Sequence, residues 1–334
     1  MRNSAGQHRG ISPTETRPCS EAPIEQTMIW KLLNRRQAAR LTLPRTFTRD
    51  TMYSLIDAML DQGEDCRHSH ILLDFSKLEQ IQVGGVATLS NMIEASRKAG
   101  VKVNFTGVAG CKAAPFLEGS GFVAQYCGGA SVGTKRNAPH APLRLVEYSR
   151  SASYLLSELV PWLGSVLKVE DRALATIKVC FEEIFNNIED HSSVNVGCSC
   201  AYFDRAAKQI TICISDIGVG IPKNVRSKME IGTDQGAIAM ACQQGFTTQT
   251  TPRNMGAGLH VLITNVVARN GGSVIIHSGS GIYSCVRERV GVVKRTGRAA
   301  RGFYPGTLIY VTLDTAQFVP DETEEKFEWE LSEF

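Results

Sequence analysis

The first third of the chain switches repeatedly between strand-like and helix-like spacing of its apolar positions. Helical spacing is clearest at Met52, Leu55, Ile56 and Leu60, where apolar side chains recur every three or four residues. The elements expected in order are a strand at 41–47, a helix at 49–60, a strand at 70–76, a helix at 84–100, a strand at 101–108 and a helix at 111–122. This β-α-β-α-β-α order predicts a compact α/β domain over residues 25–128.

The rest of the chain carries a second set of periodic segments, which predicts a second α/β domain over residues 143–318. Two strands, 198–204 and 209–216, are separated by a short polar turn and are therefore expected to pair antiparallel. The other expected elements are a strand at 143–149, helices at 151–167, 170–191 and 255–272, and strands at 273–278, 281–290 and 307–313. A length of 334 residues agrees with two domains rather than one.

Three stretches lack such periodicity. Residues 1–24 are polar and contain prolines, which predicts a disordered tail. Residues 129–142, "GASVGTKRNAPHAP", are rich in Gly, Ala and Pro and predict a linker. Residues 319–334 are acidic and are expected to form a flexible tail, with a short helix as the alternative.

The composition is typical of a soluble globular protein, with 43% hydrophobic and 21% charged residues. A net charge of +3 predicts neither nucleic-acid binding nor membrane attraction across the whole chain. No apolar run approaches the ~20 residues that span a bilayer, and the polar N-terminus lacks the apolar region of a secretory signal. We therefore expect a cytoplasmic protein whose ten cysteines are mostly reduced core residues.

Two local clusters could carry further chemistry. Cys66, His68 and His70 have the donor types of a metal site, but a solvated loop between helix and strand is the simpler interpretation. The basic segment 287–301 could contact nucleic acid or an acidic partner, and a solvated hairpin and loop is again favoured. Neither cluster therefore predicts the function.

The segment 170–191 is a helix whose apolar and polar side chains follow separate stripes, because successive residues turn by about 100°. One stripe is apolar and is expected to face the core: Ile177, Phe181, Ile184 and Ile188. The neighbouring stripe holds Glu183, Asn187 and His191, whereas Glu182 is expected to face water. The polar stripe can therefore border a buried cleft; the alternative is an ordinary amphipathic helix.

Three further motifs follow this helix. "ITICISDIGVGIP" brings a strand to Asp216, with Gly218 and Gly220 behind it; glycines let the backbone approach a flat ring, and the alternative is an Asx turn. "NMGAGLHVL" opens a helix at Gly256 and Gly258, where backbone N–H groups can bind an anion. "PGTLIYVTL" starts the last strand with a Gly-Thr pair.

Taken together and in this order, the four motifs resemble those of the Bergerat-fold GHKL superfamily of ATPases and kinases, over about residues 143–318. The pattern E-x-x-x-N-x-x-x-H most resembles the anti-sigma serine kinases. The resemblance implies an α/β sandwich, a mixed sheet covered by helices, that binds ATP and Mg²⁺. It also implies an ATP lid between Pro222 and Met255, with Thr247, Thr248 and Arg253 as candidates for phosphate contact.

The resemblance also implies a role for each matching residue. Glu183 would be the general base, and Asn187 would ligate Mg²⁺ through a neutral oxygen, with His191 in the same motif. Asp216 would accept a hydrogen bond from the adenine amine. The remaining nucleotide-binding residues implied are Gly218, Gly220, Gly256, Gly258, Leu259 and Thr307.

The segment from "ILLDFS" to "VNFTGV" is similar to STAS domains, which implies a STAS-like N-terminal domain. Antagonists of that family carry a serine at the turn before the helix, where it is phosphorylated. Here the turn reads Gln82, Val83, Gly84, Gly85 and offers no hydroxyl. The expected role is therefore an interaction module for a protein partner or a second copy, with a generic α/β domain as the alternative.

Several functions remain open at this point. The first is a regulatory protein that binds ATP and Mg²⁺ and hydrolyses ATP or uses it as a switch. The others are a serine/threonine kinase acting on a partner, and an interaction protein with a non-catalytic ATP site. A sensor histidine kinase is disfavoured because the helices at 151–168 contain no histidine.

Overall fold

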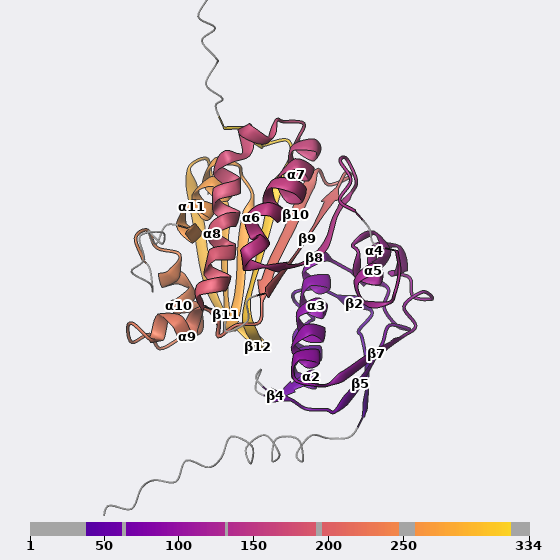
Figure 1. Ribbon diagram of the computed structural model, residues 1–334. Helices are drawn as coiled ribbons and strands as arrows, with labels where there is room; N and C mark the ends of the chain where they lie inside the picture. Colours follow the sequence, from indigo (N-terminus) through magenta and orange to yellow (C-terminus); the bar gives the residue numbers. More distant parts are fainter. Residues whose placement is uncertain (1–37, 62–64, 131–132, 192–195, 247–257, 322–334) are drawn as a thin grey trace, which may run out of the picture. The chain divides into compact units, whose positions relative to one another are not determined.

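The computed structural model describes residues 38–61, 65–130, 133–191, 196–246 and 258–321, with the backbone alone at 148 and 187–191 (Figure 1). The described residues belong to one compact unit. They combine helices with parallel and antiparallel sheets, so the expected α/β class is confirmed.

The N-terminal part contains a three-stranded parallel sheet in the order β1-β5-β7. Its strands are β1 (Ala39–Thr42), β5 (His70–Asp74) and β7 (Lys102–Thr106). The helices are α2 (Tyr53–Met59), α3 (Val83–Lys98), α4 (Ala114–Gly119) and α5 (Phe122–Tyr126). Two short pairs add β2 (Thr46–Phe47) with β6 (Gln80–Ile81), and β3 (Leu60–Asp61) with β4 (Asp65–Cys66). Ile71, Leu73 and Phe75 alternate along the chain and are fully buried, because the face that they share packs into the apolar core.

The C-terminal part is a five-stranded antiparallel sheet in the order β11-β12-β10-β9-β8. The strands are β8 (His140–Glu147), β9 (Val196–Asp204), β10 (Gln209–Asp216), β11 (Ser273–Arg289) and β12 (Val292–Asp314). β9 and β10 pair antiparallel, as predicted. Figure 1 shows the helices of this part gathered on one face of the sheet.

Those helices come from three stretches of the chain. The first runs through η1 (Tyr148–Arg150), α6 (Ser151–Tyr154), η2 (Leu155–Leu159) and α7 (Val160–Leu167) into η3 (Asp171–Leu174) and α8 (Ala175–His191). The second is α9 (Gly220–Arg226) and α10 (Asp234–Ala241), and the third is α11 (Gly258–Ile263) with η4 (Thr264–Arg269). On α8, Ile177, Phe181 and Ile184 are all at most 2% exposed, which confirms these three positions of the predicted apolar stripe. The side chain of Ile188, the fourth, lies outside the described part.

The opposite face of the antiparallel sheet is covered by α3, which contacts β9 and β10. Side chains alternate along β10, so Ile212 and Ile214 join the core under α8, while Cys213 faces α3. Small side chains on this face let the helix approach closely; the thiol of Cys200 donates to the Val83 carbonyl at 3.4 Å.

Several boundaries differ from the prediction. β11 is one strand where two were expected, because bulges near Gly279 and Gly281 keep the ladder continuous across the glycines. β12 begins at Val292 rather than 307. The basic segment 287–301 is therefore the solvated hairpin that was expected, but the part expected to be a loop is paired strand. α9 and α10 were not predicted as helices.

The predicted linker is also shorter than 129–142, because β8 begins at His140. The amide of Phe203 donates to the Pro139 carbonyl at 2.7 Å, and the Trp162 indole donates to the Ala138 carbonyl at 2.9 Å. This end of the segment is therefore held against the C-terminal part.

Candidate functional site

Asp216 is the last residue of β10 and is only 7% exposed. One oxygen, Oδ1, accepts a hydrogen bond from the Gly218 amide at 2.7 Å. Burial raises the pKa of Asp216 to about 7, and backbone hydrogen bonds from Gly218 and Thr307 oppose this rise only in part. The bond from the Gly218 amide is the Asx turn that was the alternative interpretation. A carboxylate has about four acceptor positions, so the turn does not use up the acceptor capacity of Asp216.

The backbone around Asp216 depends on two glycines in the left-handed region. Gly220 has φ +77°, and a Cβ placed there would lie 2.8 Å from the Ser278 hydroxyl. Gly306 has φ +87°, and its Cβ would meet the Asp216 carbonyl and approach the Gly218 amide to 2.6 Å. An L side chain at either position would therefore be strained and would collide with the backbone or hydroxyl that forms the site.

Thr307 lies directly opposite Asp216 in the β10–β12 ladder. Ser278 of β11 links the neighbouring strands: its Oγ donates to the Gly306 carbonyl at 2.7 Å and accepts from the Ile221 amide at 2.9 Å. Its Oγ also lies 3.3 Å from the Thr307 hydroxyl. The structure thus brings Asp216, Gly218, Gly220 and Thr307 together. Ser278, which connects the Gly220 and Thr307 segments, is a residue that the sequence analysis missed.

A second group forms where α8 meets α11. A Cβ at Gly258 would lie 2.7 Å from the Glu183 Cβ, so only a glycine allows α11 to begin at this distance from α8. Leu259, the next residue, is buried in the core between the helices and the sheet. Glu182, by contrast, forms an ion pair with Lys178 at 3.4 Å, one turn earlier on α8.

Helix α8 contacts α9, which begins at Gly220, and α11, which begins at Gly258. The residues around Asp216 and the contact between Glu183 and Gly258 therefore lie along the same helix. Gly256 and the lid candidates Thr247, Thr248 and Arg253 lie outside the described residues. The side chains of Asn187 and His191 also lie outside the described part, although α8 itself extends to His191.

The first part of the predicted lid is held against the sheet. Thr233 caps α10 by accepting from the Gly236 amide at 3.2 Å. Asp234 pairs with Arg226 of α9 at 2.6 Å and accepts from the Ser280 amide of β11 at 2.7 Å. Residues 220–241 therefore form two anchored helices beside the Asp216 group.

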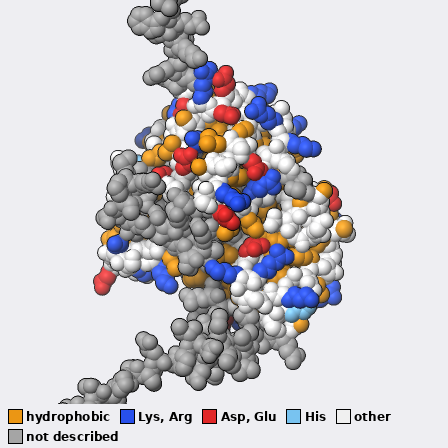
Figure 2. Space-filling view, in the orientation of Figure 1, with side chains coloured by type: hydrophobic (Ala, Val, Ile, Leu, Met, Phe, Trp, Pro, Cys, Tyr) orange, Lys and Arg blue, Asp and Glu red, His pale blue; other side chains and the backbone are white. Residues whose placement is uncertain are grey.

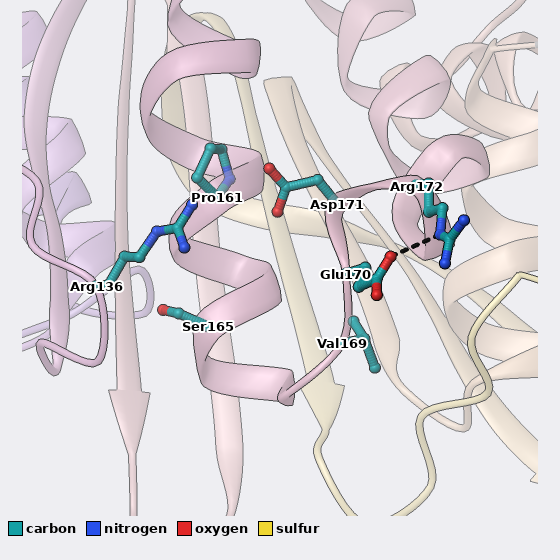
Figure 3. Close-up of a pocket in the computed structure, with 7 residues that line it drawn as sticks. All are labelled: Arg136, Pro161, Ser165, Val169, Glu170, Asp171 and Arg172. Carbon is teal, nitrogen blue, oxygen red and sulfur yellow. Dashed lines mark ion pairs between the residues drawn. The ribbon is translucent and has the colours of Figure 1, made fainter.

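A surface pocket lies elsewhere, at the end of α7 and the start of η3 (Figure 3). Its lining residues are Arg136, Pro161, Ser165, Val169, Glu170, Asp171 and Arg172. Arg172 and Glu170 already pair with each other at 2.6 Å. None of the predicted site residues lines it, and its charges do not converge on a common point.

The predictions on metal ligands, cysteines and membrane-spanning helices can each be checked on the described residues. Among them, no three His, Cys, Asp or Glu side chains form a group that could hold a metal ion, the Cys66, His68 and His70 cluster included. Eight of the nine cysteines in the described part are buried, and all nine are free thiols. No helix there combines the length and apolarity needed to cross a bilayer. Basic and acidic side chains are interspersed on the face seen in Figure 2.

Comparison with known proteins adds no assignment to this geometry. No protein-family model matches the sequence, and no curated protein matches it significantly. The function therefore has to be argued from the residues themselves.

Proposed function

We propose that this protein is a cytoplasmic regulatory protein that binds ATP with Mg²⁺ and either hydrolyses it or uses it as a conformational switch. Residues 143–318 would form a Bergerat-type ATP-binding domain, and residues 25–128 a STAS-like interaction domain. The observation that carries the proposal is Asp216, a buried carboxylate at a strand end, surrounded by Gly218, Gly220 and Thr307.

A buried carboxylate is costly unless it has a polar partner, and such groups concentrate at functional sites. The exocyclic amine of adenine is a donor of the right kind for this acceptor. Guanine carries an oxygen at the same ring position and would face Asp216 with a second acceptor. The glycine backbone at 218 and 220 would allow the flat ring to lie close to the chain.

The contact between Glu183 and Gly258 supports the second half of the proposal. The first backbone amides of α11 favour phosphate oxygens, and Glu183 lies beside them. A carboxylate in this position can orient a water or a hydroxyl for in-line attack. Asn187, one helical turn after Glu183, would offer Mg²⁺ a neutral oxygen, and the ion would neutralise charge on the phosphates.

A serine/threonine kinase acting on another protein is the alternative, because phosphotransfer would use the same base and metal. The protein's own STAS-like turn is a poor acceptor. Val83 and Gly84 have no hydroxyl, and Ser90 is fully buried with its hydroxyl 2.7 Å from that of Tyr126. A protein partner or a second copy would supply the acceptor.

Titration calorimetry with ATP and with GTP, both with Mg²⁺, tests the proposal. We expect measurable affinity for ATP and a much weaker affinity for GTP. Equal affinities for the two nucleotides, or none for ATP, would refute it. Incubation with labelled ATP then separates the alternatives: released phosphate alone favours an ATPase, and label on an added partner favours a kinase.

A further inference from the structure

A buried polar cluster lies between α3 and the antiparallel sheet. The side-chain amide of Asn91, on α3, donates to the Ser215 hydroxyl at 2.6 Å and lies 3.2 Å from the Tyr304 hydroxyl. Its carbonyl oxygen accepts from the Cys198 thiol at 3.2 Å. All four side chains are at most 4% exposed, so their polar groups bond to one another instead of to water.

The cluster leads directly to Asp216. Ser215 immediately precedes it on β10, and the Ser215 hydroxyl donates to the Thr307 carbonyl at 2.7 Å. Thr307 lies directly opposite Asp216 in the β10–β12 ladder. The Asn91 amide also lies 3.4 Å from the Asp216 carbonyl oxygen. Two short routes therefore connect α3 to Asp216, one through its ladder partner Thr307 and one through the backbone of β10.

Asn91 differs from Ser90, its neighbour on α3, in the part of the molecule to which its hydrogen-bond partners belong. Ser90 bonds with Tyr126, within the N-terminal part. The partners described for Asn91 all belong to the sheet: Cys198, Ser215, Asp216 and Tyr304. An amide is costly to bury and adds little to apolar packing. Its contribution is therefore to fix the end of β10 rather than to complete the core of its own part.

We propose that Asn91 is a positioning residue for Asp216, so that the N-terminal part completes the adenine-reading end of the site. The nucleotide aspect of this inference rests on the proposed function. Asn91 holds the Ser215 hydroxyl, which binds the Thr307 carbonyl opposite Asp216. The backbone positions of Ser215, Asp216 and Thr307 in turn set the direction of the carboxylate. By reciprocity, a nucleotide bound at Asp216 strengthens the docking of α3 on the sheet.

Hydrogen exchange of residues 209–221 in the nucleotide-free protein tests the positioning directly. The variants are Asn91→Ala and, as a matched control, Ser90→Ala, which removes the buried hydrogen bond to Tyr126 from the same helix. Tyr304→Phe removes one hydroxyl of the cluster with little change in volume and serves if Asn91→Ala folds poorly. We expect exchange at 209–221 to rise about tenfold in the cluster variants, the usual effect of losing a buried hydrogen bond, and to stay unchanged in Ser90→Ala.

The same variants are then titrated with ATP. We expect Asn91→Ala to weaken ATP binding about five- to tenfold, and Ser90→Ala to leave it unchanged. Equal exchange and equal ATP affinity in the two variants would overturn the positioning role while leaving the proposed function intact. Faster exchange in Asn91→Ala, in a protein whose wild type binds no ATP, would support the positioning of Asp216 and refute the proposed function.

Discussion

The two ends of the candidate site are built in different ways. At one end, Asp216 lies in a network of buried hydrogen bonds that reaches three strands and α3. At the other end, Glu183 and Gly258 meet through a close helix–helix contact. In the proposed function, the first end would recognise a flat ring, and the second would position the reacting groups. Substitutions at the first end should change binding and stability, whereas those at the second should change turnover.

The largest effect is expected at the Glu183 end. Glu183→Ala should lower ATP turnover by on the order of 10²-fold or more, typical of a lost general base, with little change in ATP affinity. Glu182→Ala is the matched control, because Glu182 is engaged with Lys178. Phosphate release measures both. A larger loss in Glu182→Ala would mean that the other stripe of α8 carries the chemistry.

The next effect concerns the backbone at the Asp216 end. Gly306→Ala should destabilise the protein by about 3 kcal/mol, because the new Cβ meets the Asp216 carbonyl and Gly218 amide in a left-handed conformation. Gly291→Ala is the control: it has φ +74° but nothing within 4 Å of its Cβ, so only about 1 kcal/mol is expected. Denaturant unfolding compares them, and equal losses would show that the close approach costs nothing.

Asp216→Asn should change the stability of the protein in a way that depends on pH. The folded pKa of about 7 lies above the ordinary value of 3.8 for an aspartate, so the stability that protonated Asp216 contributes is present below pH 4 and lost as pH rises through 7. The variant should therefore be more stable than wild type at pH 8, on the order of 2 kcal/mol, with a smaller difference at pH 5. Unfolding at both pH values measures this. A variant less stable than wild type at pH 8 would show that the carboxylate is well stabilised by its neighbours.

A smaller effect is expected at Ser278. Ser278→Ala removes the hydroxyl that connects the Gly306 carbonyl to the Ile221 amide. The loss should be about 1 kcal/mol in stability, with weaker ATP binding because the Gly220 and Gly306 segments lose their common partner. Ser280→Ala provides a control at an exposed hydroxyl on the same strand. Similar behaviour of the two variants would exclude a specific role for Ser278.

The sequence predicted the parts of this fold that follow from periodicity. The stripe of Ile177, Phe181 and Ile184 is one case, and the strand that ends at Asp216 is another. The grouping of Asp216 with Gly220 and Thr307 was expected only from the order of motifs, since residues far apart in sequence show no local pattern of contact.

The remaining features depend on tertiary contacts that leave little local pattern. Ser278 is one hydroxyl in an apolar strand, and Asn91 one amide in a helix with many small residues, so neither stands out. The short helix α10 lacks apolar periodicity; its signal is the Thr233 cap. The prediction began the last strand at 307 because the preceding residues include arginines and glycines. β12 in fact begins at Val292, since a paired strand tolerates such residues where it is exposed.

The most direct test of the central claim compares ATP with an analogue that lacks the 6-amino group, purine riboside triphosphate. Calorimetry with Mg²⁺ would measure both ligands on wild type and on Asp216→Asn. Wild type should lose about 1–3 kcal/mol of binding free energy when the amine is absent, and the variant should lose much less, because its acceptor is already altered. Equal losses in the two proteins would show that Asp216 does not read the adenine amine.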